Sequence, residues 1–505
     1  MPKRASGTPR APRASQAAPS PTPVALLSST SRQFPSTNPP SGHGVTESYR
    51  AVFPRNFNKE PLLTVGSAGH YMLTPDGRQI YDASGGAAVS CLGPGPNERI
   101  IRAMYEQMLQ GVYINPSTME YPVIKSCAER LLATTNGEMV SVRFYSSGTD
   151  GCEAAEKLAL QYWKEKGQDR DRFLGRLQSY HGTSFGTLAI GSHKPRRDIF
   201  EANMMIVKHA LPCDSYRGQR HGETDTQYVA RLMEDMEARI TEAGREKVAA
   251  VWIEPVVGAA LGCMPPVRGY LKAVRDLCDK YKILLIFDEI MCGMGRTGKM
   301  YAWQHENVVP DILIAGKGMS AGFSPMSAMF ISKRSGIYET LKNGSGIFNH
   351  GHTFENFSLS CAAALELLNI IDDEKLLTNI TKMGELLKQR LKDELGDLPN
   401  VGDIRGCGLF LGVEFVKNKS TKESFPISDH ISEEICQLAI ETYDIQFYPC
   451  GGSNGKDGHS LIIAPAYNID ESHVDLIVGR LKDVITDYFS TRRNPEVESS
   501  QPLIA

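Results

Sequence analysis

The chain has 505 residues, of which 41% are hydrophobic and 22% charged, and its formal net charge is −3 at pH 7. This length exceeds what one hydrophobic core usually organises, so we expect more than one domain. The near-neutral balance provides no excess of basic residues, and we expect no nucleic-acid partner.

The cysteines and the apolar runs exclude two further classes. Eleven cysteines are scattered without a CxxC pair or a Cys/His cluster at metal-ligand spacing, which is typical of a reducing compartment. We therefore predict no structural metal. No apolar stretch approaches the roughly 18 residues that a membrane-spanning helix needs, so we expect a soluble protein without membrane contact.

Residues 1–46 have the composition of a disordered tail. They are rich in Ser, Pro, Ala and Thr, and the first acidic residue is Glu47. This basic, acid-free composition is similar to a mitochondrial transit peptide, but the prolines oppose the amphipathic helix that such a signal needs. We expect a cytoplasmic protein, with mitochondrial targeting as the alternative.

A helix is predicted after the run Tyr145-Ser-Ser-Gly-Thr-Asp150, because residues 153–164 are amphipathic. Ser147, Gly148 and Thr149 would place hydroxyls and free backbone N–H groups at the positive end of the helix dipole, where phosphate binds. The alternative is structural: Thr149 or Asp150 caps the helix and Gly148 serves the turn.

Two apolar runs, 248–254 and 283–288, are predicted as buried strands, and the alternation of strands with helices predicts an α/β protein with a largely parallel sheet. Each of these strands ends in an acid, Glu254 and Asp288. Ligands of open α/β sheets collect at the carboxyl ends of strands, so we expect these acids to be neighbours in a site.

The run Gly293-Met-Gly-Arg-Thr-Gly298-Lys299-Met300 fits GxGxxG and most of a phosphate-binding loop. Its context argues against nucleotide binding, because Met300 replaces the magnesium-binding Ser/Thr and the run follows the acidic strand. A P-loop or dinucleotide-binding protein is therefore only a minor alternative.

Lys317 stands between two glycines a fixed interval after the strand that ends at Asp288. A lysine amine can condense with an aldehyde cofactor, and an aspartate at a strand end can keep a pyridine nitrogen protonated. This pairing indicates Schiff-base chemistry.

After Val401 the pattern changes to a strand with glycines at 404–414, a helix from about Ser428 and another strand near Leu461. This pattern predicts a smaller α+β domain. The residues from Arg492 onward have the composition of an unstructured end.

In unbroken order from about residue 50 to 485, the chain resembles the class III aminotransferases, which depend on pyridoxal 5'-phosphate. The resemblance rests on the following runs: Ser147-Gly-Thr149, Tyr180-His-Gly182, Glu254-Pro255, Asp288-Glu289, Gly293 to Gly298, Lys317 and His350-Gly-His-Thr-Phe354.

The resemblance implies a fold-type-I transferase, with a large domain built on a mostly parallel sheet and a smaller α+β domain. The expected divisions are as follows: a disordered tail at 1–46, an N-terminal segment of the small domain at 47–100, the large cofactor-binding domain at 101–370, the C-terminal small domain at 371–488 and a tail at 489–505. It also implies a homodimer with active sites at the subunit interface.

By position, Lys317 resembles the lysine that bonds to the cofactor and carries the substrate proton, and Asp288 the carboxylate paired with the pyridinium nitrogen. The other residues that the resemblance assigns to cofactor binding are Ser147, Gly148, Thr149, Tyr180 as the stacking ring, His181, Glu254 near the ring, Met291 and, from the partner subunit, Thr353. A structural role for Glu254 is equally open.

Departures from the family pattern bear on the substrate. Ala259 and Ile462 stand where ornithine and 4-aminobutyrate transaminases pair a glutamate with an arginine. Met291 stands where those enzymes carry a glutamine beside the cofactor ring, and this difference makes the chain more similar to the ω-transaminase branch. Tyr448 precedes Pro449 where that branch often has a mobile arginine. We expect one substrate to lack a conventionally bound α-carboxylate and to occupy an apolar pocket with Ala88, Ala259 and Tyr448.

The implied reaction moves an amino group from a primary amine or amino acid to a carbonyl acceptor by ping-pong kinetics. An aminomutase, racemase or decarboxylase would use the same residues and fold, so these stay open as alternatives.

Overall fold

The computed structural model describes residues 51–493, and the tail predicted at 1–46 lies outside this range. Every helix and strand of the described part belongs to one compact unit that begins at Leu62. Within residues 51–493, no helix is both long and apolar enough to cross a bilayer.

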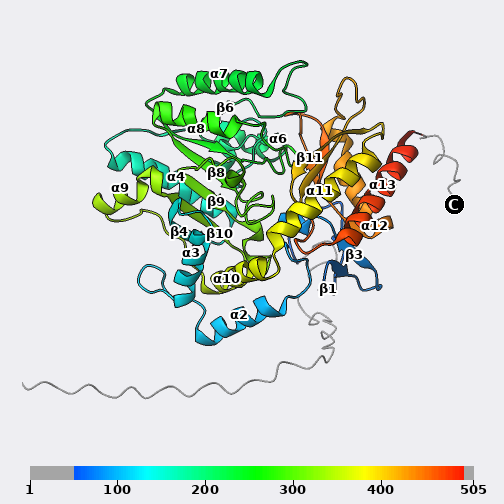
Figure 1. The fold of residues 1–505 in the computed structure, drawn as a ribbon, viewed down its shortest axis with the longest axis horizontal. Helices are drawn as coiled ribbons and strands as arrows, with labels where there is room; N and C mark the ends of the chain where they lie inside the picture. The colour runs from blue at the N-terminus through cyan, green and yellow to red at the C-terminus, as the bar shows by residue number, and fades with distance from the viewer. Residues whose placement is uncertain (1–50, 494–505) are drawn as a thin grey trace, which may run out of the picture. The chain divides into compact units, whose positions relative to one another are not determined.

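A seven-stranded sheet lies among the cyan and green helices on the left of Figure 1. In spatial order its strands are β4 (Met139–Tyr145), β10 (Ser327–Ser332), β9 (Ile312–Ala315), β8 (Leu284–Glu289), β7 (Val248–Ile253), β5 (Arg172–Arg176) and β6 (Lys208–Ala210). The pairs from β9 through β6 are parallel, and only β10 runs antiparallel to its two neighbours. The predicted α/β class with a largely parallel sheet is confirmed.

Both faces of this sheet are covered by helices. Successive side chains of a strand point to opposite faces, so alternate residues pack into different clusters. Ile286 and Ile314 pack with α4 (Gly148–Glu165), whereas Leu285 and Leu313 belong to the larger core on the other face. Helices that contribute to this larger core are α3 (Pro122–Ala133), α7 (Asp225–Ala243), α8 (Tyr270–Tyr281) and α10 (Ser358–Asp373).

The remaining helices near the large sheet connect or flank these layers. They are the kinked α1 (Gly85–Ala88), α2 (Glu98–Gln110), α5 (Phe185–Ile190), α6 (Lys194–Arg197) and α9 (Ile337–Asn343). Short 3-10 turns are η1 (Asp198–Asn203), η2 (Ala302–His305), η3 (Lys317–Ser320), η4 (Lys333–Ser335) and η5 (Ile427–Asp429).

A second, antiparallel sheet contains β11 (Val401–Cys407), β12 (Phe410–Phe415), β15 (His459–Ile463) and β14 (Tyr448–Gly451). The strand predicted at 404–414 is thus two strands, because Gly408, at φ 58°, lies between β11 and β12 and permits a tight turn. The accompanying helices are α11 (Leu376–Leu395), α12 (Ile431–Tyr443) and α13 (Glu471–Arg493). Helix α13 continues past residue 489, where a tail was predicted.

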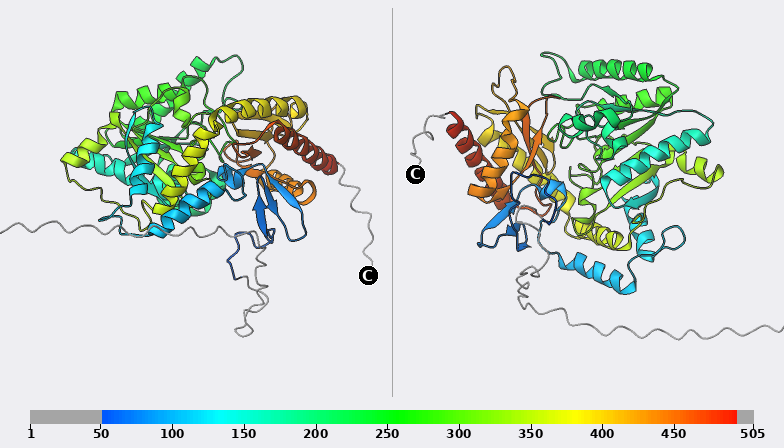
Figure 2. Two further views of the ribbon diagram at one scale, coloured as in Figure 1. Left: turned by 60° about the horizontal axis from the view of Figure 1, so that its bottom comes forward. Right: turned by 180° about the vertical axis from the view of Figure 1, so that it is seen from behind.

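A third sheet pairs strands from the start of the described chain with a strand from its C-terminal part. Its strands are β1 (Gly66–Ala68), β2 (Tyr71–Leu73), β3 (Gln79–Asp82) and β13 (Ile445–Gln446), and β3 and β13 pair in parallel. In both views of Figure 2 these N-terminal strands lie beside the C-terminal elements. The boundaries predicted at residues 100, 370 and 488 stay a prediction, and this pairing supports grouping 47–100 with the C-terminal part.

Candidate functional site

The carboxyl ends of the parallel strands bring the predicted residues to one edge of the large sheet. Asp288 lies at the end of β8, Glu254 directly follows β7, and Lys317 follows β9 by two residues. Ile253 at the end of β7 is paired with Phe287, which makes Glu254 and Asp288 neighbours, as predicted. The parallel order of the strands therefore builds the site.

Asp288 is buried and held by three groups. Its Oδ2 is 2.8 Å from Nδ1 of His181 and 3.8 Å from Sγ of Cys152, and its Oδ1 accepts a 3.0 Å hydrogen bond from the backbone N–H of Ile290. Within residues 51–493, the buried Nε2 of His181 has no hydrogen-bond partner. The carboxylate is thus fixed in place by its neighbours.

Lys317 is half-buried and has a left-handed backbone, with φ 45°. Such a conformation costs a residue with a side chain about 1 kcal/mol, so the surrounding turn must stabilise it. Burial lowers the pKa of the Lys317 amine, the carboxylate of Asp288 opposes this shift, and the charge of Arg196 adds to it. A lower pKa leaves more of the nucleophilic, neutral amine near pH 7.

Glu254 ties two turns together. Its carboxylate oxygens accept hydrogen bonds from the backbone N–H of Tyr180, at 3.0 Å, and of Gly258, at 3.1 Å. Burial raises the pKa of this carboxyl. These bonds fix the backbone that carries Tyr180, so the contacts within the chain give Glu254 a structural role.

The N-terminus of α4 is capped by Ser147. Its Oγ accepts a hydrogen bond from the backbone N–H of Asp150, so the cap is neither of the residues considered from the sequence. Thr149 instead accepts a hydrogen bond from the backbone N–H of Thr183 through Oγ1, at 3.2 Å. The first N–H groups of the helix, at Gly148 and Thr149, have no partner within the helix.

Two glycines make room for the chain that follows Asp288. A Cβ at Gly148 would lie 2.7 Å from Cδ1 of Ile290, and a Cβ at Gly258 would lie 2.3 Å from Sδ of Met291. Both separations are shorter than a carbon or sulfur contact allows. The glycines therefore let Ile290 and Met291 pack against α4 and the turn after β7.

The predicted substrate-pocket residues belong to one hydrophobic cluster. Ala88 and Ala259 are buried in it, and Tyr448 and Met291 pack against it partly buried. Ile462 is buried in the same cluster, so the two positions where related enzymes carry a glutamate and an arginine lie in one apolar region.

Arg196, in α6, is a residue that the sequence analysis missed. Its Nη2 donates a 2.9 Å hydrogen bond to the Tyr448 hydroxyl, and its guanidinium carbon lies 4.6 Å from the centre of the Tyr180 ring. The only sequence signal was the basic run Lys194-Pro-Arg-Arg197, which resembles an exposed turn.

Thr353, which the resemblance assigns to the cofactor site of the partner subunit, is exposed in the single chain.

The Gly293–Gly298 run forms a packed turn. Gly295 and Gly298 have positive φ angles, and Cβ atoms there would lie 3.1 Å from Cδ2 of Leu377 and 2.5 Å from Oγ1 of Thr381 on α11. The next helical element, η2, has only four residues. The glycines thus serve packing against α11, and a phosphate-binding helix does not follow them.

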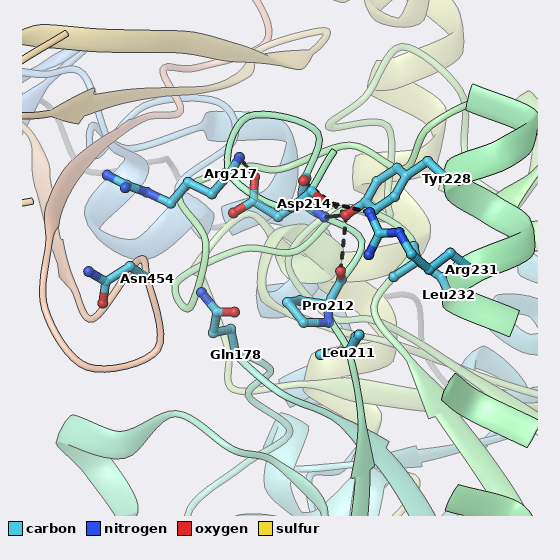
Figure 3. Close-up of a pocket in the computed structure, with 10 residues that line it drawn as sticks. Gln178, Leu211, Pro212, Asp214, Arg217, Tyr228, Arg231, Leu232 and Asn454 are labelled. Atoms are coloured by element: carbon cyan, nitrogen blue, oxygen red, sulfur yellow. Dashed lines mark hydrogen bonds between the residues drawn. The ribbon is translucent and has the colours of Figure 1, made fainter. Parts of the chain in front are cut away.

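A cavity of about 370 Å³ lies elsewhere, and none of the predicted site residues lines it (Figure 3). Its two arginines are already paired, Arg217 with Glu414 and Arg231 with Glu223. The Tyr228 hydroxyl donates to the carbonyl of Asp214, which closes one wall.

Comparison with known proteins places this geometry in a family. Residues 52–485 match the model described as aminotransferase class III. An aminotransferase of Gibberella zeae is 41% identical over 432 residues, which are 84% of either chain. The taurine–pyruvate aminotransferase of Bilophila wadsworthia is 32% identical over 85% of this chain and 93% of its own.

Solved structures agree. The ω-transaminase of Pseudomonas jessenii in complex with PMP has a TM-score of 0.80 and 27% identity, covering 88% of this chain and 97% of its own. The chain belongs to the class III aminotransferase family. It is an enzyme of pyridoxal-phosphate-dependent transamination between amine donors and carbonyl acceptors.

The residues present fit pyridoxal 5'-phosphate, the cofactor typical of this family. The half-buried amine of Lys317, with its lowered pKa, matches an aldehyde. The buried carboxylate of Asp288 matches a pyridine nitrogen, and the N–H groups at the start of α4 match a phosphate. The orphaned Nε2 of His181 adds a polar atom close to the same carboxylate.

Proposed function

We propose that Lys317 and Asp288 are the catalytic residues of this transaminase. Bound pyridoxal phosphate supplies an electron sink for negative charge on the substrate carbon. Nζ of Lys317 would take the proton from that carbon and return it at a different atom, and Asp288 would keep the ring nitrogen of the bound cofactor protonated. The observation that supports this assignment most strongly is the burial of Asp288 beside an amine of lowered pKa.

The other predicted cofactor contacts follow from position. Gly148 and Thr149 would donate their backbone N–H groups to the phosphate. The Ser147 hydroxyl donates instead to the carboxylate of Asp150. Tyr180 would stack on the ring, with its backbone held by Glu254. His181 would orient Asp288, and Met291 would cover the ring edge.

We further propose that one substrate is an amine or carbonyl compound without a conventionally bound α-carboxylate. The apolar cluster that contains Ala88, Ala259 and Tyr448 supports this proposal. A carboxylate buried against Ala259 and Ile462 would have no charged partner there. Turnover confined to glutamate and 2-oxoglutarate in a substrate screen would contradict it.

A homodimer is proposed from an apolar stripe on α2. Ile100 and Gln107 are buried, whereas Ile101, Tyr105 and Met108 recur at helical spacing on an exposed side. Tyr113 lies just beyond and contacts the exposed Phe354, with ring centres 5.9 Å apart. Phe354 follows Thr353, so a second copy covering this stripe would bring Thr353 to the interface, as the family resemblance implies.

Replacing Lys317 by alanine tests the catalytic assignment. We expect the purified wild type to show a visible absorbance band from covalently bound cofactor, which amines bleach and a carbonyl acceptor restores. In Lys317→Ala the band should no longer be bleached and restored, and kcat should fall at least about 1000-fold, because the amine that bonds to the cofactor is missing.

Lys282→Ala is the matched control, since Lys282 also has a left-handed backbone, with φ 53°, but is exposed. It should keep the band and the turnover. A Lys317→Ala protein that still cycles between amine and acceptor would refute the assignment.

A further inference from the structure

Arg196 connects two predicted site residues from different parts of the chain. It lies in α6, on the connection between β5 and β6 of the large sheet, and hydrogen-bonds to Tyr448 at the start of β14 in the second sheet. Its guanidinium also lies against the ring of Tyr180. The arginine therefore has a defined position at the edge of the catalytic cluster.

Within the described residues, the charge of Arg196 has no counter-ion. Among residues 51–493, no carboxylate lies within ion-pairing distance of Arg196, although both basic neighbours in α6 are paired, Lys194 with Asp198 and Arg197 with Glu201. The hydroxyl of Tyr448 is a neutral acceptor. A half-buried guanidinium with only neutral partners is poorly solvated and attracts an anion.

The surroundings do not supply that anion. The apolar cluster next to Tyr448 contains Ala259 and Ile462, and neither position carries an acid. The positive charge also reaches the catalytic amine, because it contributes to lowering the pKa of Lys317. An anionic group on a substrate would thus meet one unpaired cation close to the reacting amine.

We propose that Arg196, held by Tyr448, binds the carboxylate of the carbonyl acceptor. A guanidinium presents parallel N–H donors that match a carboxylate and retains its charge at any working pH. The apolar cluster would contact the amine donor, which by the proposal above carries no conventionally bound α-carboxylate. This inference rests on the transaminase function proposed above and adds a specificity-determining residue to it.

The test compares an anionic acceptor with its neutral isostere. Pyruvate and pyruvamide have nearly the same shape, but only pyruvate can pair with a guanidinium. We expect Arg196→Gln to lower kcat/KM for pyruvate by about 10- to 100-fold, mainly through KM, and to change that for pyruvamide by less than about threefold. Arg196→Lys should recover part of the loss, because it restores the charge without the planar donor pair.

Arg197→Gln is the matched control. Arg197 adjoins Arg196 on the same short helix, but its Nη1 donates to the carbonyl of Gly191 and its charge pairs with Glu201. We expect its kinetics with both acceptors to match the wild type. Equal losses with pyruvate and pyruvamide in Arg196→Gln would overturn the proposal and assign Arg196 to positioning Tyr180.

Calorimetric titration with propionate, an unreactive carboxylate, gives a readout that does not depend on turnover. The Kd of the holoenzyme for propionate should rise about 10-fold or more in Arg196→Gln and stay unchanged in Arg197→Gln. An unchanged Kd in Arg196→Gln would contradict the proposal. If Lys317→Ala still cycles between amine and acceptor while propionate binding depends on Arg196, the proposed catalytic assignment fails and the anion site stands.

Discussion

His193 shows how a single buried residue couples the stability of the fold to pH. His193 lies three residues before Arg196 in the chain. Its Nε2 donates a 3.0 Å hydrogen bond to the carbonyl of Gly451 in β14. Within the described residues its buried Nδ1 has no partner. Burial lowers the pKa of His193 to about 4, the bond to Gly451 opposes this shift, and the charge of Arg196 adds to it.

This shift predicts acid sensitivity. In the unfolded chain the pKa of His193 is about 6.5, so the unfolded state takes up a proton between pH 6.5 and 4 before the folded state does. The free energy of unfolding should therefore fall as the pH falls through this window, by up to about 3 kcal/mol from this residue. Urea unfolding at pH 7.5 and 4.5 measures the difference.

His193→Gln keeps a side-chain N–H donor but cannot take up a proton, so its acid-induced loss of stability should be smaller than that of the wild type. His221→Gln, at an exposed histidine, should lose as much as the wild type. Identical pH slopes for His193→Gln and the wild type would contradict the prediction.

At this scale the sequence predicted residues whose chemistry is unusual for their position. Lys317 between glycines and Asp288 at a strand end were identifiable because few structural roles need them there. Arg196 and Cys152 were not, since a basic turn and a helical cysteine are common. Their contacts with Tyr448 and with Asp288 depend on tertiary packing, which local patterns do not encode.

At the scale of elements, the start of α4 depends on a close approach between two segments. The helix begins shortly after β4, with Ser147 as its cap. Ile290, two residues after Asp288, occupies the space that a side chain at position 148 would need. The same isoleucine lies 3.4 Å from the position of a Cβ at Gly316. One side chain thus sets the spacing of the proposed phosphate and lysine turns.

Gly148→Ala should therefore disturb both turns. The new Cβ would lie 2.7 Å from Cδ1 of Ile290, and we expect a loss of about 1–3 kcal/mol in the free energy of unfolding together with weaker cofactor binding. Adding Ile290→Val removes Cδ1 and should restore part of both quantities. Denaturant unfolding and cofactor titration of the two single variants and the double variant give the coupling energy. Strict additivity would show that Ile290 does not cause the effect.

The helices and strands with strong periodicity were predictable, and the irregular turns were less so. The strands near 250 and 286 and the helix after Gly148 lie within a few residues of their predicted positions. The cap was misplaced because Ser147, Thr149 and Asp150 all suit it by type. The run 404–414 predicts one strand, because its glycines do not distinguish a strand interior from a hairpin turn.

At the scale of the whole molecule, the proposed dimer depends on the apolar stripe of α2. Leu109, which is 64% exposed, adjoins this stripe. Leu109→Lys should lower the mass measured by light scattering from that of a dimer to that of a monomer, because a buried unpaired charge opposes association. Activity should fall with it, since Thr353 would no longer complete the partner's site.

Ile206→Lys is the control, at a residue that is 90% exposed and lies outside α2 and the Thr353 segment. It should keep the dimer mass and the activity. A wild-type protein that is monomeric and fully active would refute both the dimer and the role of Thr353.

The pairing of β3 with β13 has a consequence for how the polypeptide is made. Tyr81 lies in register with Ile445, so the sheet that begins near the N-terminus stays incomplete until almost the whole chain has left the ribosome. At about 5–20 residues per second, the delay is on the order of tens of seconds. The early strands present an open edge throughout that interval, and an open edge is prone to pair with a strand of another chain.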